Sequence, residues 1–481
     1  MTTQPATFRD LVTGGTLPQY LLICMGIWLF AADSMVTITI MPSVGRALSG
    51  YEWFGWATAG YLLGSVIAGA SAGLLALRIG LQRATAAAAL TYAAGCALSA
   101  WAPDMGVFLA GRLLQGVGGG WIVGFCMVAI GLLFPDRLLP KVYATTSSIW
   151  GVATLVGPMI GGLFADSGAG GWRWVFWLFA FQAVLVAFAA FRLLPTERGN
   201  ARIGIAWAQL GLITAAVAAI GLADRVGDAP RMIALTAAAI ACLLAAVMVD
   251  ARAEARLLPR GANDPRTIPG AGFSAMFLLS AASMGFALYA AAILQTLNGF
   301  SALLAGYIIA GQALAWSIAS LSVSRLTGAW RGTVIRIGAV CIASAVALGA
   351  ASLRSGSPAG VFFTGVLMGV GFGLSWSFVN QRLLMSMEKE ERARAAAGMA
   401  TVRSTGSAVG AAGAAAVANL AGLSLGLTPA TASAAGLWVS LAMTPLAFLG
   451  LWPMWRLSAL YPPAPAETPS AAAARVDDQA A

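Results

Sequence analysis

Residues 17 to 41 read LPQYLLICMGIWLFAADSMVTITIM, and Asp33 is the single charged side chain in this run. A hydrocarbon core about 30 Å thick is crossed by about 20 helical residues, because each residue rises about 1.5 Å. Backbone polar groups in lipid must pair within their own segment, so such a run forms a helix. It is longer than the apolar core of a signal peptide, and no cleavage site of small residues follows it. We therefore expect it to stay in the protein as the first membrane span.

Apolar runs of similar length recur along the whole chain of 481 residues, which is 59% hydrophobic and 10% charged. This composition does not suit a soluble surface, and it predicts an all-α membrane protein. Fourteen spans are expected, near 17–41, 53–76, 84–101, 105–130, 142–164, 172–194, 205–223, 232–249, 270–294, 301–323, 333–353, 358–379, 397–420 and 433–456.

The net charge of +10 is spread in small groups between the apolar runs, which argues against a nucleic-acid-binding surface. On the assignment above, 21 arginines and lysines fall on one side of the membrane, five on the other and two within spans. Positively charged loops stay in the cytoplasm. We therefore expect a multi-pass protein of a bacterial-type inner membrane with both termini cytoplasmic.

Metal and cofactor chemistry is not indicated. The chain has no histidine, and its five cysteines are scattered singly within apolar runs without a CxxC pair. A disulfide framework or a zinc site is not expected, and no cofactor is expected. Because histidine is absent, any proton transfer must use carboxylates.

An internal repeat suggests two related halves. The sequence Gly-Val-Phe-Leu-Ala-Gly over 106–111 opens the fourth span, and Gly-Val-Phe-Phe-Thr-Gly over 360–365 opens the twelfth. Span i therefore matches span i+8, and two related halves that rock about a central site are common in secondary transporters. The expected domains are a cytoplasmic segment (1–16), a six-helix bundle (17–200), two inserted helices (201–266), a second six-helix bundle (267–460) and a disordered tail (461–481).

Asp33 is the one acidic residue placed well inside an apolar run, and ionisable groups at membrane depth usually mark a pathway or a proton site. Arg112 lies in the fourth span at a similar depth, about 10–12 Å from the outer end of its helix. The two can therefore pair directly or through water. A structural ion pair is the alternative interpretation. Movement of Arg112 or entry of substrate could switch Asp33 between its protonated and ionised forms, since burial favours the neutral form and the guanidinium favours the charged one.

Other candidates are less specific. Small residues at spacings of about four let membrane helices pack closely, and the Gly157-Pro158 pair could add a hinge or a seal. Arg403, in the thirteenth span, either faces a site or extends to the interface. Aromatic side chains could line a cavity for flat or cationic ligands, or simply pack or face lipid. The glycines are Gly116, Gly151, Gly157, Gly161 and Gly162, and the aromatic residues are Trp28, Trp150, Tyr289, Trp316 and Trp376.

Five motifs in order resemble the fourteen-span drug:proton antiporter branch of the major facilitator superfamily. They are Asp33 to Pro42 in the first span, Gly73-Leu-Leu-Ala-Leu-Arg78-Ile-Gly80-Leu-Gln-Arg83 in the following loop, Gly111-Arg112-Leu-Leu-Gln115-Gly116 in the fourth span, Gly151 to Gly162 in the fifth and Arg403 to Gly410 in the thirteenth. The resemblance implies the major facilitator fold, a gating loop, a proton-coupling pair and an antiporter motif. In the loop, Leu77 replaces the acid of the family pattern, which leaves the latch of the outward-open state in doubt.

Together these features predict a monomeric, proton-coupled exporter of small lipophilic or cationic compounds, with Asp33 as the proton site and Arg112 as its partner. Two alternatives remain within transport: a nutrient uniporter or symporter, and a lipid or lysolipid flippase. A membrane-embedded enzyme would need clustered acids, histidines or metal ligands, and the sequence has none.

Overall fold

The computed structural model describes residues 16–134, 138–165, 167–168, 170–196, 204, 206–223, 229–323, 326 and 330–459. Its regular elements are all helical in this part of the chain. The long helices are α2 (Leu17–Ala47), α3 (Phe54–Ile79), α4 (Leu81–Trp101), α5 (Met105–Leu133), α6 (Leu139–Ala165), α7 (Trp172–Leu193), α8 (Trp207–Leu222), α9 (Ala229–Arg252), α10 (Ile268–Asn298), α11 (Ala302–Val323), α12 (Trp330–Ser355), α13 (Pro358–Met385), α14 (Lys389–Leu420) and α15 (Pro429–Leu449). Short elements are η1 (Tyr51–Trp53), η3 (Leu423–Leu425) and α16 (Leu451–Ala459).

Each expected span coincides with one of the helices α2 to α15, although the last expected span also includes the start of α16. Within the described residues, ten helices are long and apolar enough to cross a membrane. The count of fourteen spans stays a prediction, because α3, α4 and α14 do not meet that measure and α8 is shorter. The expected disordered tail (461–481) and nearly all of the expected segment 1–16 lie outside the described residues.

Local sequence explains where several helices begin and end. Gly80 has φ 84°, a conformation that favours glycine, and it separates α3 from α4. The side chain of Asp104 accepts a hydrogen bond from the backbone N–H of Val107 and caps α5. Thr428 and Thr431 form a reciprocal capping box at the start of α15.

The helices pack in two groups. Helices α2 to α7, here called the N-bundle, pack on one another, and α10 to α15 form the C-bundle. The domain division expected from the sequence and the separate movement of the two bundles stay predictions. The N-bundle is packed closely around α5: an added Cβ at Gly116 would meet the Tyr61 carbonyl of α3 at 2.1 Å, and one at Gly118 would meet Tyr92 of α4 at 2.4 Å.

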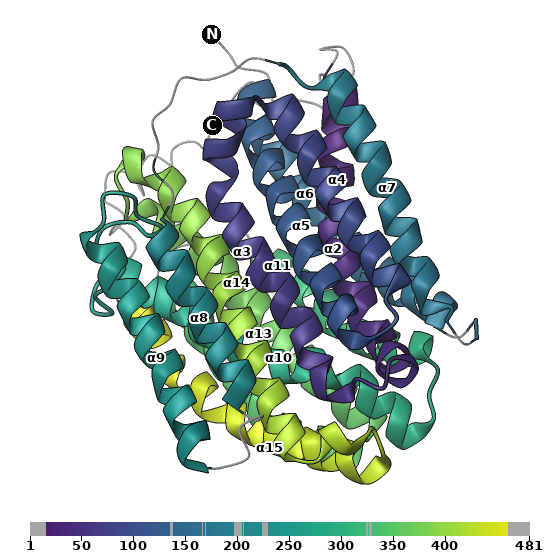
Figure 1. Ribbon diagram of the computed structural model, residues 1–481. Coiled ribbons are helices and arrows are strands. Elements are labelled where there is room, and N and C mark those ends of the chain that lie inside the picture. The colour runs from purple at the N-terminus through teal and green to yellow at the C-terminus, as the bar shows by residue number, and fades with distance from the viewer. Residues whose placement is uncertain are drawn as a thin grey trace, which may run out of the picture.

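Helices α8 and α9 pack against each other and lie beside the C-bundle, to the left of α14 in Figure 1. At one end of α8, the indole N–H of Trp56 on α3 donates to the Gly221 carbonyl at 3.1 Å. On α14, Gly413 faces Ile220 of the same helix α8. Helix α8 therefore covers the place where α3 of the N-bundle meets α14 of the C-bundle.

A connection over residues 253–267, here called the strap, leads from α9 to α10. The buried carboxylate of Asp250 accepts the backbone N–H groups of Leu257 at 2.6 Å and Leu258 at 3.1 Å. It also accepts the amide of Gln209 on α8 at 3.2 Å. Further along, the backbone N–H of Arg260 donates to the carboxylate of Glu391 at the start of α14. The strap thus ties the inserted helices to the C-bundle.

The two bundles touch at one end of α3 and α14 and separate toward the other. An added Cβ at Gly55 would lie 2.4 Å from Ala415 of α14, whereas one at Gly73 would have nothing within 4 Å. These two glycines are five helical turns apart and so lie on the same face of α3. On α14, Ala396 is exposed and Ala414, again five turns away on one face, is fully buried.

The second contact between the bundles, between α6 and α11, opens in the same direction. An added Cβ at Gly162 would meet Leu303 at 2.6 Å, and one at Gly306 would meet Pro158 at 2.5 Å. Gly151, on nearly the same face of α6 two turns before Pro158, has nothing within 4 Å of an added Cβ. We call the touching end, which includes η1 and η3, the closed end, and the opposite one, which includes Ile79 and Lys389, the open end.

Candidate functional site

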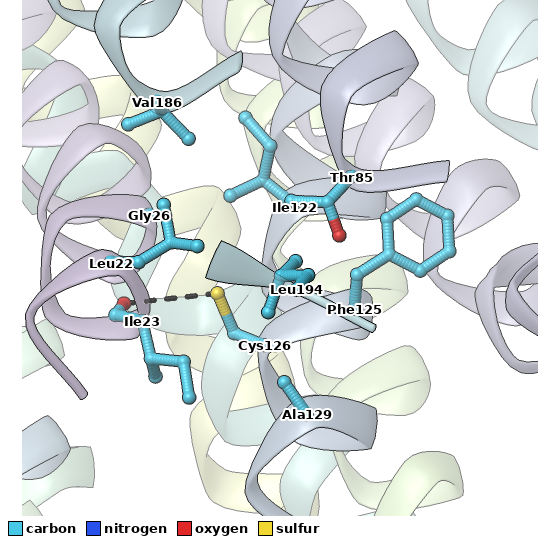
Figure 2. Close-up of a pocket in the computed structure, with 10 residues that line it drawn as sticks. All are labelled: Leu22, Ile23, Gly26, Thr85, Ile122, Phe125, Cys126, Ala129, Val186 and Leu194. Atoms are coloured by element: carbon cyan, nitrogen blue, oxygen red, sulfur yellow. Dashed lines mark hydrogen bonds between the residues drawn. The ribbon is translucent and has the colours of Figure 1, made fainter. Parts of the chain in front are cut away.

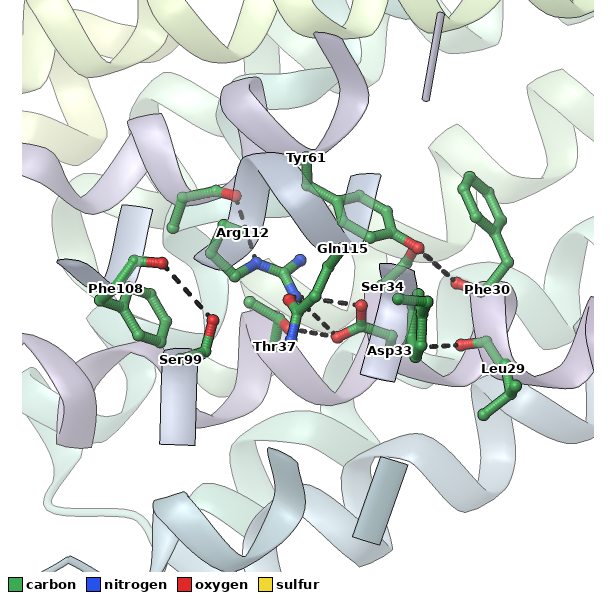
Figure 3. Close-up of polar contacts among 12 residues, drawn as sticks. Leu29, Phe30, Asp33, Ser34, Thr37, Tyr61, Ser99, Phe108, Arg112 and Gln115 are labelled. Atoms are coloured by element: carbon green, nitrogen blue, oxygen red, sulfur yellow. Dashed lines mark hydrogen bonds and ion pairs between the residues drawn. The ribbon is translucent and has the colours of Figure 1, made fainter. Parts of the chain in front are cut away.

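The centre of the N-bundle contains a buried ion pair between α2 and α5. Arg112 Nη1 lies 2.8 Å from Asp33 Oδ1 and 3.0 Å from Oδ2. The carboxylate is 0% exposed and the guanidinium 1% exposed. The structure therefore brings together the two residues that the sequence singled out, and their contact is direct (Figure 3).

Polar groups from three helices surround the pair. Thr37, one turn along α2, donates its hydroxyl to Asp33 Oδ1 at 3.0 Å. Arg112 also donates from Nη1 to the Gln115 amide oxygen and from Nε to the Ala57 carbonyl at 3.4 Å. Both charged groups thus have hydrogen-bonding partners besides each other, as charges buried at membrane depth require.

Tyr61 of α3 links this pair to the space between the bundles. Its ring lies under the guanidinium, 4.4 Å from Arg112 Cζ, and its hydroxyl donates to the Phe30 carbonyl at 3.3 Å. The half-buried ring of Phe30 stacks on Tyr61 at 5.3 Å and meets Trp150 of α6 edge-on at 6.0 Å. A molecule that contacts Phe30 and Trp150 would therefore be separated from the Tyr61 ring, which supports Arg112, only by the Phe30 side chain.

Sequence reasoning missed Tyr61, Thr37 and Phe30 as parts of this site. Each lies in an apolar run, where an aromatic or hydroxyl side chain is usually a packing residue, and no spacing rule connects α3 with Asp33. The four-residue interval between Asp33 and Thr37 was the only available signal, since residues four apart lie on one helix face.

The gating-motif residues lie at the open end. Gly73, Arg78 and Arg83 are exposed, and Gly80 forms the turn between α3 and α4. The side chain of Leu77 is outside the described residues. An added Cβ at Gly73 would have nothing within 4 Å, in keeping with the separation of the bundles there.

The antiporter-motif residues of α6 divide by position. Gly157 and Gly161 face Met35 and Thr39 of α2, so they bring α6 close to the helix that carries Asp33. Pro158 and Gly162 face α11 across the contact between the bundles, and Gly151 faces open space. One face of α6 thus packs on α2, the helix that carries Asp33, and the adjacent face packs on the C-bundle.

The candidate cavity aromatics are dispersed. Tyr289 is 2% exposed and stacks on Phe54 at 5.6 Å, where α10 meets α3 at the closed end. Trp316 stacks on Phe372 at 5.0 Å and meets Trp376 edge-on at 6.4 Å within the C-bundle.

Two further residues that the sequence suggested for a cavity are Trp28 and Arg403. Trp28 is half-buried on α2, two residues from Phe30. Arg403 is exposed on α14.

A small cavity within the N-bundle lies between α2, α4, α5 and α7 (Figure 2). Apolar side chains line it, among them Ile23, Ile122 and Phe125, and the Cys126 thiol points to the Ile23 carbonyl at 3.7 Å. Its volume of about 10 Å³ holds at most one water molecule. It is too small for a transported compound. In the described part of the chain, no group of three or more acidic or cysteine side chains could hold a metal ion.

Comparison with curated proteins gives relatives that extend over most of the chain. A protein of Mycobacterium tuberculosis named "Probable multidrug-efflux transporter" is 29% identical over 440 residues, which is 87% of this chain and 91% of that protein. The Bacillus subtilis protein named "Multidrug transporter protein MdtP" is 25% identical over 402 residues, covering 81% of this chain and 73% of that one.

Solved structures share the fold at low sequence identity. A POT family transporter in complex with 5-aminolevulinic acid superposes with a TM-score of 0.64 at 13% identity, covering 93% of this chain and 96% of that one. The inward-open xylose transporter XylE of E. coli gives a TM-score of 0.61 at 17% identity, covering 92% and 99%. The family model described as Major Facilitator Superfamily matches residues 23–411. The chain therefore belongs to the Major Facilitator Superfamily and is a membrane transporter, not an enzyme.

Proposed function

We propose that the protein is a proton-coupled exporter of small lipophilic or cationic compounds, working by alternating access across the inner membrane. The observation that supports proton coupling is the buried Asp33–Arg112 pair, the one ion pair at membrane depth among the described residues. Export is supported by the relatives, one named a probable multidrug-efflux transporter and one a multidrug transporter.

The charge distribution supports an orientation in which the open end faces the cytoplasm. Arginines of the described chain gather at that end, as positively charged residues do on the cytoplasmic side. They include Arg78, Arg83, Arg382, Arg392 and Arg394. In this orientation both termini are cytoplasmic, and the bundles are apart where a compound would enter from the cell interior.

The pair supplies a simple coupling mechanism. Without a proton, Asp33 holds Arg112 over the Tyr61 ring, and the site carries no net charge. When a proton reaches Asp33 from the outside in the opposite conformation, the carboxyl no longer holds the guanidinium. Arg112 keeps its contacts with Gln115 and the Ala57 carbonyl, while Tyr61 and the adjoining Phe30 are free to shift. This shift releases the compound outside, and loss of the proton inside restores the pair.

One carboxyl at the site predicts one proton per cycle. One proton moved through about 100 mV supplies about 2.3 kcal/mol, which sustains about a 50-fold gradient of a neutral compound. Exchange of a monovalent cation for one proton moves no net charge, so only a pH gradient would drive it.

A test uses the purified protein in vesicles that contain a pH-sensitive dye. Lipophilic cations and neutral compounds are added after a pH gradient is imposed, and compound-evoked proton flux is recorded for wild type and Asp33→Asn. The matched control is Asp104→Asn, because Asp104 caps α5 at the surface and asparagine caps equally well.

We expect compound-evoked proton flux in wild type and in the control, and none in Asp33→Asn. Flux in Asp33→Asn equal to that of wild type would remove Asp33 from the proton pathway. Transport of a compound without proton flux in wild type would favour a uniporter, and movement of labelled lipid instead of any compound would favour a flippase.

A further inference from the structure

We propose that Arg403 is a substrate-binding residue that selects lipophilic compounds bearing a carboxylate group. The inference rests on the proposed export function and narrows its substrate class. It starts from a cation within α14 that faces the space between the bundles and has no acidic partner.

The position of Arg403 on α14 follows from its neighbours. Gly410 packs on Ala281 of α10, and Ala411 packs on α3 at Gly55. Arg403 precedes Gly410 by seven residues, so its side chain leaves α14 on nearly the same face, displaced toward the face that carries Ala411. This direction lies between α10 and α3. At the level of Arg403 the two bundles have separated, and the Arg403 side chain is exposed.

Exposure to lipid does not explain this side chain. Other faces of α14 are covered by the inserted helix α8, at Gly413, and by the strap, at Gly398. Arg403 forms no hydrogen bond or ion pair in the described structure. An arginine at membrane depth normally pairs or faces a water-filled space, because its desolvation is costly. Arg403 is therefore a free guanidinium directed into the space between the bundles.

The depth of Arg403 matches that of the aromatic side chains on the opposite bundle. It lies eight residues, about 12 Å, on the open side of Ala411, which packs against the N-bundle. Trp150 lies the same eight residues on the open side of Pro158, which packs against the C-bundle. Trp150 contacts Phe30, one turn from Asp33. A molecule between the bundles at this depth thus meets two aromatic rings on one side and a guanidinium on the other.

This arrangement fits an aromatic or otherwise apolar compound with one carboxylate. The rings provide apolar contact area, and arginine binds carboxylates through two parallel hydrogen bonds. The Asp33–Arg112 pair contributes no net charge, whereas Arg403 adds a positive charge to this space, which favours an anionic compound over a cationic one. Export of a carboxylate against one proton would move two positive charges inward, so the membrane potential would drive this exchange twice as strongly as the movement of one charge.

The test uses three probes that share a pyrene ring: 1-pyrenebutyrate, 1-pyrenebutanol and 1-pyrenebutylammonium. Binding is measured by energy transfer from protein tryptophan to pyrene, in nanodiscs of phosphatidylcholine with empty nanodiscs as background. We expect wild type to bind the carboxylate about 10- to 100-fold more tightly than the alcohol, the range for hydrogen bonds to a charged group, and to bind the ammonium least.

Variants assign the preference to one side chain. Arg403→Gln should lose the preference for the carboxylate while keeping affinity for the alcohol, and Arg403→Lys should keep part of the preference. The matched control is Arg394→Gln, because Arg394 is on the same helix but is paired with Glu391 at the surface. It should bind like wild type. Equal melting temperatures of the Arg403 variants and wild type would confirm that they are folded.

Several results would overturn the proposal: equal binding of the three probes, tightest binding of the ammonium, no saturable binding, or an unchanged preference in Arg403→Gln. Loss of carboxylate binding when phosphatidylglycerol is added would assign Arg403 to an anionic lipid headgroup instead. Asp33→Asn should retain the preference. If 1-pyrenebutylammonium is exchanged for protons through Asp33, the proposed antiport stands and the carboxylate assignment is rejected. If the preference for the carboxylate depends on Arg403 but no proton flux is seen, the carboxylate assignment stands and the proposed antiport is rejected.

Discussion

Replacement of Arg112 by methionine should destabilise the protein more than replacement of both members of the ion pair. Methionine has a similar length but no charge, so Arg112→Met leaves the fully buried Asp33 carboxylate with Thr37 as its remaining side-chain hydrogen-bond partner among the described residues. Removing one partner of a buried pair costs about 3–5 kcal/mol, because the other charge is left uncompensated. Asp33→Asn leaves the guanidinium in the same situation, apart from its bonds to Gln115 and the Ala57 carbonyl.

The double variant Asp33→Asn/Arg112→Met contains neither charge. Its loss of unfolding free energy should be only about 1–3 kcal/mol, because the remaining penalty comes from hydrogen-bond acceptors that lose a donor. The coupling between the two positions should therefore be at least about 3 kcal/mol, the smallest sum of the two single costs less the largest double cost. Thermal unfolding of the four purified proteins in one detergent measures it. The double variant should melt above Arg112→Met although it carries one more substitution.

The opposite order would refute this reasoning. Suppose that Asp33→Asn lowers the melting temperature by the same amount in Arg112→Met as in wild type. The two side chains then do not interact. Their contact would then make no contribution to stability, and a coupling mechanism based on breaking it would lose its physical basis.

Three further outcomes are expected. Gly116→Val should lower the melting temperature by several degrees or abolish folding, because an added Cβ would collide with the Tyr61 carbonyl oxygen of α3. The control Gly60→Val should melt like wild type, because an added Cβ there would have nothing within 4 Å. Gly55→Val should impair transport, because a side chain at Gly55 would collide with Ala415 of the C-bundle and prevent the closed end from forming. Transport by Gly55→Val equal to that of wild type would reject the role of this contact in the two-bundle mechanism. Asp250→Ala should speed proteolytic cleavage in the strap and lower the melting temperature, because two backbone N–H groups lose a buried acceptor, and Asp250→Asn should have a smaller effect.

Much of the architecture could be predicted from periodic hydrophobicity, because a helix in lipid satisfies its backbone locally and its length is fixed by bilayer thickness. The residues at which helices begin and end were harder to predict than the helices themselves. Helix α14 starts at Lys389, eight residues before the expected span, since the charged stretch before Ala397 is helical but not apolar. The capping of α5 by Asp104 and the turn at Gly80 were readable locally, but the number of helices that cross the membrane is not set by hydropathy alone.

The sequence by itself determined that Asp33 and Arg112 are exceptional, because a charge in an apolar run is costly wherever the chain folds. It could not show that the two touch, or that Tyr61 and Thr37 contact them. Those facts depend on how helices far apart in the chain pack, and that packing is decided by close contacts such as Gly116 against Tyr61 and Gly55 against Ala415. In the sequence, a glycine that contacts a neighbouring helix cannot be distinguished from one that does not. Only the tertiary structure distinguishes Gly55, which is in contact, from Gly73, which faces open space five turns away on the same helix.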